Sequence, residues 1–394
     1  MSPAACDGLG ASPLRLASAL TQPRRGALNW IEAGGRSVVY THQGRNAIAL
    51  FCRMAGLRPG DQVLAPAYNC GAEIDPFVKA GARVVLYDVD RRLEIDVDRI
   101  VAALSPATRI LYVTHFFGFP QPLGELAAAC GKQGVLLMED CAQALYSVSG
   151  DKPAGLAGDA AVFSFVKTLP VPDGGALLAD RRFGPPRQPE KQPPAAATGR
   201  ACLPLVKRWL VNSASSSPLH RLAGSVALRH SRASTAASDG RRRPPMLSSN
   251  RYVEARTAWT MSRVARAILA AADGAEVARA RRRNFQFLLE ALRSVPGFEP
   301  ALPALPEGVS PMAFPFFGSS RSYWYSQLTA KGILVQGWPG YYPGLDWDAC
   351  PGACFLKDEL LTLPVHQGLT EAHMQYIADA VRAAAKLAPA GSAC

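Results

Sequence analysis

Short apolar runs alternate with amphipathic segments through residues 40–180. The runs are rich in β-branched side chains and predict strands at residues 62–65, 83–88, 109–115, 135–140, 160–165 and 175–178. Between them, the apolar residues of segments 45–57, 71–81, 95–104 and 122–134 recur near a 3.6-residue period, which predicts helices. Continuous apolar strands separated by helices indicate a largely parallel sheet that is covered on both faces.

The alternation of predicted strands and helices ends after residue 180. Residues 181–250 are rich in Pro, Ser, Ala and Arg and predict a flexible, partly disordered insert with some amphipathic character in its middle. A long helical pattern then covers residues 260–295, and it is followed by short strand patterns at 311–318, 332–338 and 362–365 and a closing helix at 370–387. We therefore expect a large α/β domain in residues 1–180, the basic insert in 181–250, and a long helix with a small α+β domain in 251–394.

The net charge of +12 is concentrated in this insert. Residues 181–250 hold 13 Lys and Arg against two acids, whereas the other 324 residues hold 30 basic and 29 acidic groups. A groove that follows phosphates would need positive charge on the folded domains, so we expect no nucleic-acid partner. The basic run is usually a solvated segment, although a peripheral contact with a membrane or a protein through 181–250 stays open.

The remaining composition excludes other classes. Apolar residues make up 48% of the chain and charged residues 19%, as in proteins that bury large cores. No apolar run approaches the roughly 18–20 residues that span a bilayer, and the N-terminus lacks a signal-peptide pattern. The nine cysteines are scattered without a ligand-like spacing. We therefore expect a cytoplasmic protein without a metal site.

Polar residues recur where the predicted strands end. His115 and Asp140 end two strands, Gln143 follows Asp140 by three residues, and Ser164 and Lys167 close a third strand. Ligands of open α/β sheets bind at the carboxyl ends of the strands. A lysine amine can form a Schiff base, a carboxylate can keep a pyridine nitrogen protonated, and a helix N-terminus can hold a phosphate. Together these residue types point to pyridoxal phosphate.

Several segments, in the same order, resemble the DegT/DnrJ/StrS family of pyridoxal-phosphate-dependent sugar aminotransferases. They are LRPGDQVLAPAYNCGAEIDPFVKAGARVVLYDVD, ILYVTHFFGFPQPL, VLLMEDCAQALYS, GLAGDAAVFSF, DGGALLAD and LTLPVHQGLTEAHMQYIADAVR. The resemblance runs from about residue 36 to residue 388 and is interrupted by the insert. It implies the three-layer fold of aspartate-aminotransferase type, with a mostly parallel sheet and a smaller C-terminal α+β domain.

The resemblance also implies roles for individual residues. Lys167 would be the catalytic residue that forms the Schiff base, Asp140 would pair with the pyridine nitrogen, and Gln143 would lie near the phenolic oxygen. His115 would line the cofactor or substrate side. The phosphate would be held by Ser164 and by the backbone N–H groups of Gly44, Arg45 and Asn46.

The chain departs from the family at three places. Lys167 follows Ser164 by three residues, whereas most members place the lysine five residues after this serine. Cys70 occupies the position of the aromatic residue that stacks on the cofactor ring, and Tyr68 could take over this contact. The segment that reaches the neighbouring subunit's phosphate in the family is reduced to AWTMS around Trp259.

The sequence thus favours an aminotransferase that moves an amino group, from glutamate by resemblance, to a keto-sugar nucleotide in polysaccharide or secondary-metabolite biosynthesis. The family implies a homodimer. Two alternatives stay open: a pyridoxal-phosphate enzyme of another reaction type, such as a dehydratase, and an inactive homologue that binds partners through the basic insert. His115 and His42 are each as readily interpreted as structural histidines as site residues.

Overall fold

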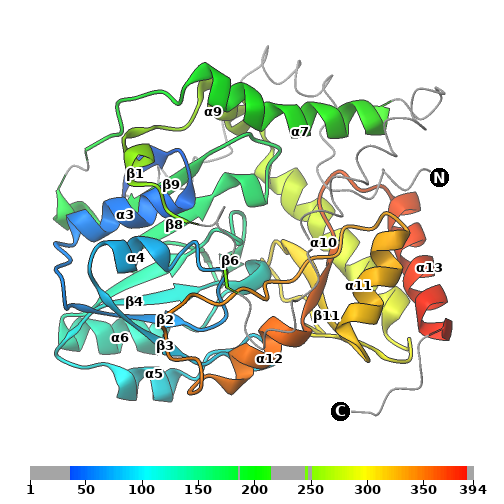
Figure 1. The fold of residues 1–394 in the computed structure, drawn as a ribbon, viewed down its shortest axis with the longest axis horizontal. Coiled ribbons are helices and arrows are strands. Elements are labelled where there is room, and N and C mark those ends of the chain that lie inside the picture. Colours follow the sequence, from blue (N-terminus) through cyan, green and yellow to red (C-terminus); the bar gives the residue numbers. More distant parts are fainter. Residues whose placement is uncertain (1–35, 185–186, 214–244, 247–250, 388–394) are drawn as a thin grey trace.

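A seven-stranded sheet forms the centre of the computed structural model, which describes residues 36–184, 187–213, 245–246 and 251–387 (Figure 1). The strand order is β1-β9-β8-β5-β4-β2-β3. These strands are β1 (Ser37–Thr41), β2 (Gln62–Pro66), β3 (Arg83–Tyr87), β4 (Thr108–Thr114), β5 (Leu136–Asp140), β8 (Ala160–Ser164) and β9 (Gly175–Ala179). A separate small hairpin joins β6 (Val148–Ser149) to β7 (Lys152–Pro153).

The sheet is parallel from β3 through β2, β4 and β5 to β8, and it becomes antiparallel at β9 and β1. The prediction of a largely parallel sheet is therefore confirmed, with strand boundaries within one or two residues of the sequence pattern. The first strand, β1, was not among the predicted strands. It pairs with β9 along its whole length, which gives the apolar run SVVYT its backbone partners.

Helices cover both faces of this sheet. On β8 and β9, alternate side chains belong to two different cores, because successive residues of a strand point to opposite faces. Val162 and Leu177 pack in the core that also contains residues of the helices α3, α4, α5 and α6. Phe163 and Leu178 pack in the core that contains residues of α9 and α10. These helices are α3 (Gly44–Met54), α4 (Asp75–Lys79), α5 (Val97–Ala103), α6 (Gly124–Gln133), α9 (Arg263–Ala271) and α10 (Gly274–Leu292).

A smaller α+β unit follows and lies with α11 and α13 at the opposite end of the molecule from β3 and α5 (Figure 1). Its antiparallel sheet has the order β10-β11-β12. Side chains from this sheet and from α10, α11 and α13 share one apolar core, whereas Ala353 and Leu356 of α12 pack in the core of the large sheet. Its elements are β10 (Phe298–Pro300), β11 (Ala313–Gly318), α11 (Arg321–Ala330), α12 (Pro351–Glu359), β12 (Leu361–Pro364) and α13 (Glu371–Leu387).

The long helix predicted over residues 260–295 is wrong in one respect. Ala272 has an extended conformation, and the Asp273 side chain accepts the backbone N–H of Glu276, so a second helix begins there. The pattern at 332–338 does not form a strand. Only Gln336 bridges to Thr362, because β12 takes its ladder partner from β11.

Backbone hydrogen bonds to residues 258 and 260 of the same chain hold part of the insert in place. Lys191 N–H donates to the Ala258 carbonyl oxygen, and Thr260 N–H donates to the Lys191 carbonyl oxygen. Helix α7 (Ala195–Ser213) follows, and residues 185–186, 214–244 and 247–250 of the predicted flexible stretch lie outside the described residues. In the described part of the chain, no helix has the length and apolar character needed to cross a membrane.

Candidate active site

The carboxyl ends of the parallel strands bring the predicted residues to one edge of the sheet. Asp140 ends β5, Ser164 ends β8, and Cys70 lies in the turn after β2. The backbone N–H of His115 donates to the Asp140 carbonyl oxygen, which extends the pairing of β4 with β5 beyond the last strand residue. Residues that are far apart in the sequence therefore meet where a ligand of such a sheet would bind.

Few direct contacts stabilise the negative charge of the buried Asp140 carboxylate. One carboxylate oxygen accepts the backbone N–H of Ala142 at 2.9 Å, and the Thr114 hydroxyl lies 3.5 Å from the other. Burial raises the pKa of Asp140, and the positive charge of Lys167 opposes this rise. A carboxylate in this state is stabilised by any further cation that comes near it.

Lys167 lies in the short 3-10 turn η3 (Phe165–Lys167) that directly follows β8. Its side chain is half-buried, and its charge acts on the pKa of both Asp140 and Cys70. Lys167 therefore lies near enough to Asp140 and Cys70 for its charge to act on both, despite its shorter spacing from Ser164.

The N-terminus of α3 lies against the end of β8. Gly44 opens the helix so close to this strand that a Cβ atom would approach the Phe163 carbonyl oxygen to 3.3 Å and the Ser164 Cβ atom to 3.4 Å. The side chain of Asn46 is buried, and neither its amide nitrogen nor its oxygen has a hydrogen-bond partner among the described residues. The backbone N–H groups of Asn46 and Ala47 donate to the Gln43 carbonyl oxygen, so the side-chain amide of Asn46 is the part of this helix start that is buried without a partner.

Two further buried atoms lack partners around this helix start. His42 Nδ1 lies 3.9 Å from Asp173 Oδ1, and neither His42 Nδ1 nor Asp173 Oδ2 has a hydrogen-bond partner among the described residues. Burial lowers the pKa of His42, although the Asp173 carboxylate opposes this. Asp173 Oδ1 accepts the backbone N–H of Ser262, so the segment AWTMS packs against the start of α3 within the same chain.

The turn after β2 carries Cys70 and is bonded to its own side chains. Cys70 N–H and Sγ both contact the Glu73 carboxylate, at 3.1 and 3.0 Å. The Asn69 amide donates to the carbonyl oxygens of Pro66 and Ala67, and its oxygen accepts Gly71 N–H. Burial and the Glu73 charge raise the pKa of the Cys70 thiol to about 12, so it is protonated at neutral pH.

Tyr68 and Arg45 flank this turn. The Tyr68 ring is buried against Phe116 and Trp338, with ring centroids 5.7 and 5.6 Å apart. The Arg45 guanidinium donates to the Arg251 carbonyl oxygen at 2.9 Å. Burial lowers the pKa of Arg45, while the nearby Cys70 and Glu73 groups oppose this. Arg45 therefore adds a cation at the start of α3 and also anchors the chain that follows the insert.

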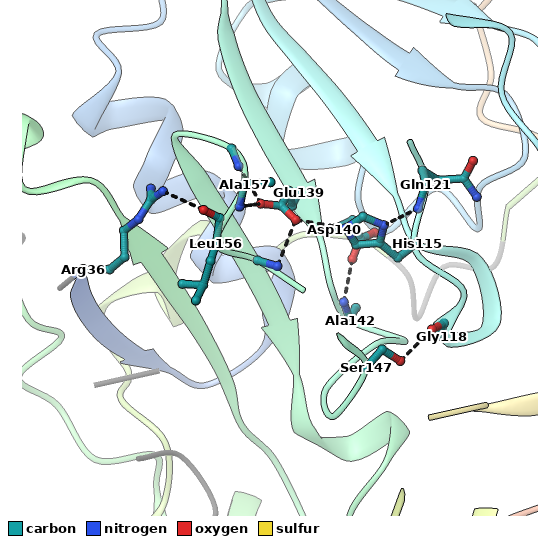
Figure 2. A network of polar contacts seen from close by, with 12 residues as sticks. Arg36, His115, Gly118, Gln121, Glu139, Asp140, Ala142, Ser147, Leu156 and Ala157 are labelled. Atoms are coloured by element: carbon teal, nitrogen blue, oxygen red, sulfur yellow. Dashed lines mark hydrogen bonds and ion pairs between the residues drawn. The ribbon is translucent and has the colours of Figure 1, made fainter. Parts of the chain in front are cut away.

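His115 is engaged with the protein through both ring nitrogens (Figure 2). Its Nδ1 accepts the backbone N–H of Gln121 at 3.0 Å, so the ring proton lies on Nε2, which contacts Glu139 Oε2 at 3.0 Å. The Glu139 carboxylate also accepts the backbone N–H groups of Gly155, Ala157 and Gly158. These contacts give His115 a positioning role beside the site and leave neither ring nitrogen for a ligand.

The charge of Glu139 is stabilised by this network. Burial by itself would raise the pKa of Glu139, but the contacts with His115 and with backbone N–H groups lower it. Cys141 approaches the pair closely enough for the three side chains to surround a metal ion. The Glu139 oxygens already accept four hydrogen bonds, however, which accounts for this cluster as a structural network.

The Gln143 side chain supports an unusual backbone conformation at Phe117. Its Oε1 accepts the backbone N–H of Phe117 at 2.9 Å, and Phe117 has a φ of 52°, which only a few residues other than glycine adopt. The Phe117 ring stacks on Trp338, with centroids 5.0 Å apart and planes at 10°. The structure thus places Gln143 near Asp140 and uses its oxygen to shape the wall of the site.

Sequence reasoning missed two charged residues near the Cys70 turn. Glu73 lies three residues after Cys70, a spacing at which a side chain can accept the earlier residue's backbone N–H. Lys357 is fully buried in α12. It falls on the buried stripe that contains Ala353, Leu356 and Leu360, so the helical period could have revealed a lysine on an apolar face.

Residues 33–182 match the model of the DegT/DnrJ/EryC1/StrS aminotransferase family, which confirms the resemblance seen in the motifs. The dTDP-4-dehydro-2,3,6-trideoxy-D-glucose 4-aminotransferase of Saccharopolyspora spinosa is 32% identical over 173 residues, which cover 39% of this chain and 45% of that protein. The chain thus matches less than half the length of this curated relative.

Solved structures extend the likeness to nearly the whole chain. The aminotransferase TlmJ from Streptoalloteichus hindustanus is 23% identical, with a TM-score of 0.64 and coverage of 96% of this chain and 97% of that one. The PLP-form of Spr1654 from Streptococcus pneumoniae is 16% identical, with a TM-score of 0.68 and coverage of 96% and 97%. At these identities the likeness establishes the fold, which is the expected three-layer fold of these aminotransferases.

Proposed function

We propose that this protein is a pyridoxal-phosphate-dependent aminotransferase that transfers an amino group from glutamate to a keto-sugar nucleotide. One observation carries the proposal. Lys167 and Asp140 share one edge of the sheet, and the positive charge of Lys167 opposes the rise that burial causes in the pKa of Asp140; both lie beside a helix N-terminus where the buried Asn46 amide has no partner. Each of these groups has a distinct job toward a pyridine ring, an aldehyde and a phosphate.

The described residues fit this cofactor. The close contact of Gly44 with β8 brings the start of α3 near Ser164, so the Gly44 N–H, the Ser164 hydroxyl and the Asn46 amide can bind phosphate oxygens together. Asp140 would hold the pyridine nitrogen in its protonated form, because a cation there offsets the cost of burying the carboxylate. Lys167 would hold the aldehyde carbon. We propose that Tyr68 and Cys70 line one face of the ring.

When bound, pyridoxal phosphate supplies an electron-withdrawing ring that makes the α-hydrogen of an amino acid acidic. The Lys167 amine then acts as the base that takes the proton from the α-carbon of the donor and as the acid that returns it. Asp140 keeps its negative charge toward the ring nitrogen throughout. His115 and Gln143 hold the surrounding strands and the Phe117 wall in place and move no proton.

The substrate class and the biological role that we propose are inferred from the relatives. The name of the Saccharopolyspora spinosa relative specifies a nucleotide-linked keto sugar, which supports this substrate class for the present chain. We further propose a homodimer that works in the cytoplasm, in the biosynthesis of a polysaccharide or a secondary metabolite. The buried unpartnered atoms of His42 and Asp173 lie beside Trp259, where the family implies contact with the second subunit.

The test measures the first half of the reaction. Purified protein loaded with pyridoxal phosphate is mixed with glutamate, and the formation of pyridoxamine phosphate is followed by absorbance and chromatography. Wild-type protein and the exposed-lysine control Lys152→Ala should convert the cofactor, whereas Lys167→Ala should lose both the near-visible absorbance of the lysine adduct and the conversion.

Two outcomes would contradict the proposal in different ways. Persistence of the near-visible absorbance in Lys167→Ala would show that another amine holds the cofactor. Normal cofactor binding in the wild type without conversion by glutamate or any other amino donor would argue for a different reaction on the same cofactor.

A further inference from the structure

Lys357 is a buried cation that joins two separate parts of the site. Its side chain has no solvent exposure, and its Nζ donates to the carbonyl oxygens of Asn69 at 2.5 Å and of Gly340 at 2.8 Å. Asn69 belongs to the turn after β2, and Gly340 belongs to the loop that precedes α12. One ammonium group therefore links the large sheet to the C-terminal part of the chain.

Aromatic rings complete the surroundings of this ammonium group. The Nζ atom lies 5.1 Å from the centroid of the Tyr341 ring and 4.9 Å from that of Trp347. The charges of Glu73 and Asp358 also act on this group, because they oppose the lowering of its pKa by burial. Carbonyl dipoles, ring faces and these charges together compensate the buried ammonium group, an arrangement that depends on the placement of both segments.

Lys357 is connected to the Cys70 turn by more than one contact. It binds the carbonyl oxygen of Asn69, the residue directly before Cys70, while Glu73 binds Cys70 from the other side. The Asn69 side chain is used entirely within the turn. Among the hydrogen bonds of the described residues, it is therefore Lys357 that connects the Asn69 carbonyl oxygen to the C-terminal segment.

The charge of this lysine is poised near neutral pH. Burial lowers the pKa of Lys357 to about 8, and the groups that oppose this are Glu73 and Cys70 in the turn and Cys354 and Asp358 on its own helix. Loss of the proton replaces two charge-assisted hydrogen bonds by weaker neutral ones and removes the cation–ring attraction.

We propose that Lys357 is a positioning residue of the cofactor site: it ties the Cys70 turn, through the Asn69 carbonyl oxygen, to the loop that contains Gly340. Deprotonation of Lys357 loosens the turn and thereby weakens the binding of an anionic ligand. The proposal rests on the proposed function, because it takes the Cys70 turn to be one wall of the cofactor site. Lys357 itself touches no ligand in this scheme and acts through the turn.

The experiment measures the affinity for 4-deoxypyridoxine 5′-phosphate, which resembles the cofactor but has no aldehyde, so that Schiff-base formation by Lys167 does not enter. Kd is determined at about pH 7 and about pH 9.5, on either side of the buried lysine's transition. The variants are wild type, Lys357→Met, and Lys386→Met, which makes the same change at an exposed position of α13.

Wild type and Lys386→Met should bind about tenfold more weakly at the higher pH, as expected when charge-assisted hydrogen bonds become neutral. Lys357→Met should bind about as weakly at both pH values as the wild type does at the higher one. A role confined to folding would shift the melting temperature of Lys357→Met and leave the pH step in Kd unchanged. The same pH step in Lys357→Met and wild type therefore overturns the positioning role.

Two further measurements separate the possible failures. If Lys357→Met does not fold, the titration is repeated with Lys357→Arg, whose guanidinium stays charged through this window and should remove the step; a step that persists overturns the proposal. If no variant binds the probe at either pH, the cofactor site itself is refuted and this proposal falls with it. Binding with unaltered pH dependence refutes the role of Lys357 alone.

Discussion

Replacement of Glu139 by Gln tests whether the buried network beside the site carries the stability that its geometry implies (Figure 2). The Glu139 carboxylate has almost no exposure and accepts hydrogen bonds from three backbone N–H groups and from His115. A glutamine amide can accept on its oxygen only, so its NH2 group would face at least one N–H donor where the carboxylate had an acceptor.

The magnitude follows from the contacts. Each buried donor that loses its acceptor costs about 1–3 kcal/mol, and the remaining bonds lose their charge assistance. We expect Glu139→Gln to lower the free energy of unfolding by about 3–5 kcal/mol at neutral pH, the range measured when one member of a buried ionic network is removed. Glu125→Gln, which makes the same change at an exposed position of α6, should stay within about 0.5 kcal/mol of wild type.

Urea unfolding of the cofactor-free proteins measures both changes, and its pH dependence adds an independent check. Because the folded protein lowers the pKa of Glu139 below 4.5, the contribution of this carboxylate is complete above that pH and is lost as the pH falls through the folded-state pKa. Wild type should therefore lose a component of stability on acidification that Glu139→Gln lacks. A neutral-pH difference below about 0.5 kcal/mol between wild type and Glu139→Gln would refute this account of the network.

Three further predictions address the site and its supports. Asp140→Asn should retain the cofactor but slow the glutamate half-reaction by about 100-fold, as measured in single-turnover kinetics, because the ring nitrogen loses its anionic partner; an unchanged rate would remove Asp140 from this role. Asn46→Ala should leave the unfolding free energy of the cofactor-free protein unchanged or raise it, since both amide atoms are buried without partners, while the Kd for inorganic phosphate rises about tenfold by calorimetry; equal phosphate affinity would contradict the anion site. Asp75→Asn should lower the urea-measured unfolding free energy by about 3 kcal/mol, because the buried carboxylate accepts the Tyr252 N–H and the Tyr342 hydroxyl, and a loss below about 0.5 kcal/mol would show that these contacts are dispensable.

The periodicity of the sequence predicted most of the central sheet. The six strands predicted for this sheet all form; five are largely buried in the covered sheet, whereas β3 at its edge is only partly buried. The pattern failed where tertiary pairing decides the outcome. The segment 332–338 has a strand-like composition but obtains only one bridge, at Gln336, and the helical pattern of 260–295 is divided by the Asp273 cap.

The sequence predicted the positions of some residues of the candidate site but not the contacts of others. Asp140, Lys167, Gly44 and Asn46 lie at strand ends and helix starts, positions that the order of elements along the chain already specifies. The partners of His115 could not be predicted in the same way. Whether its ring nitrogens face a ligand or Glu139 depends on how β4 and β5 pair and on the loop that brings Gly155 to the carboxylate.

The sequence by itself determined the order of strands and helices, the family resemblance and the residues able to serve a phosphate, a pyridine nitrogen and an aldehyde, because these depend on local period and on spacing along the chain. Only the tertiary structure decided which polar groups have partners and which do not. Lys357 meets the Asn69 carbonyl oxygen 288 residues away, and Asn46 is buried without a partner. Burial and hydrogen bonding are properties of neighbours in space, and in this fold those neighbours come from distant parts of the chain.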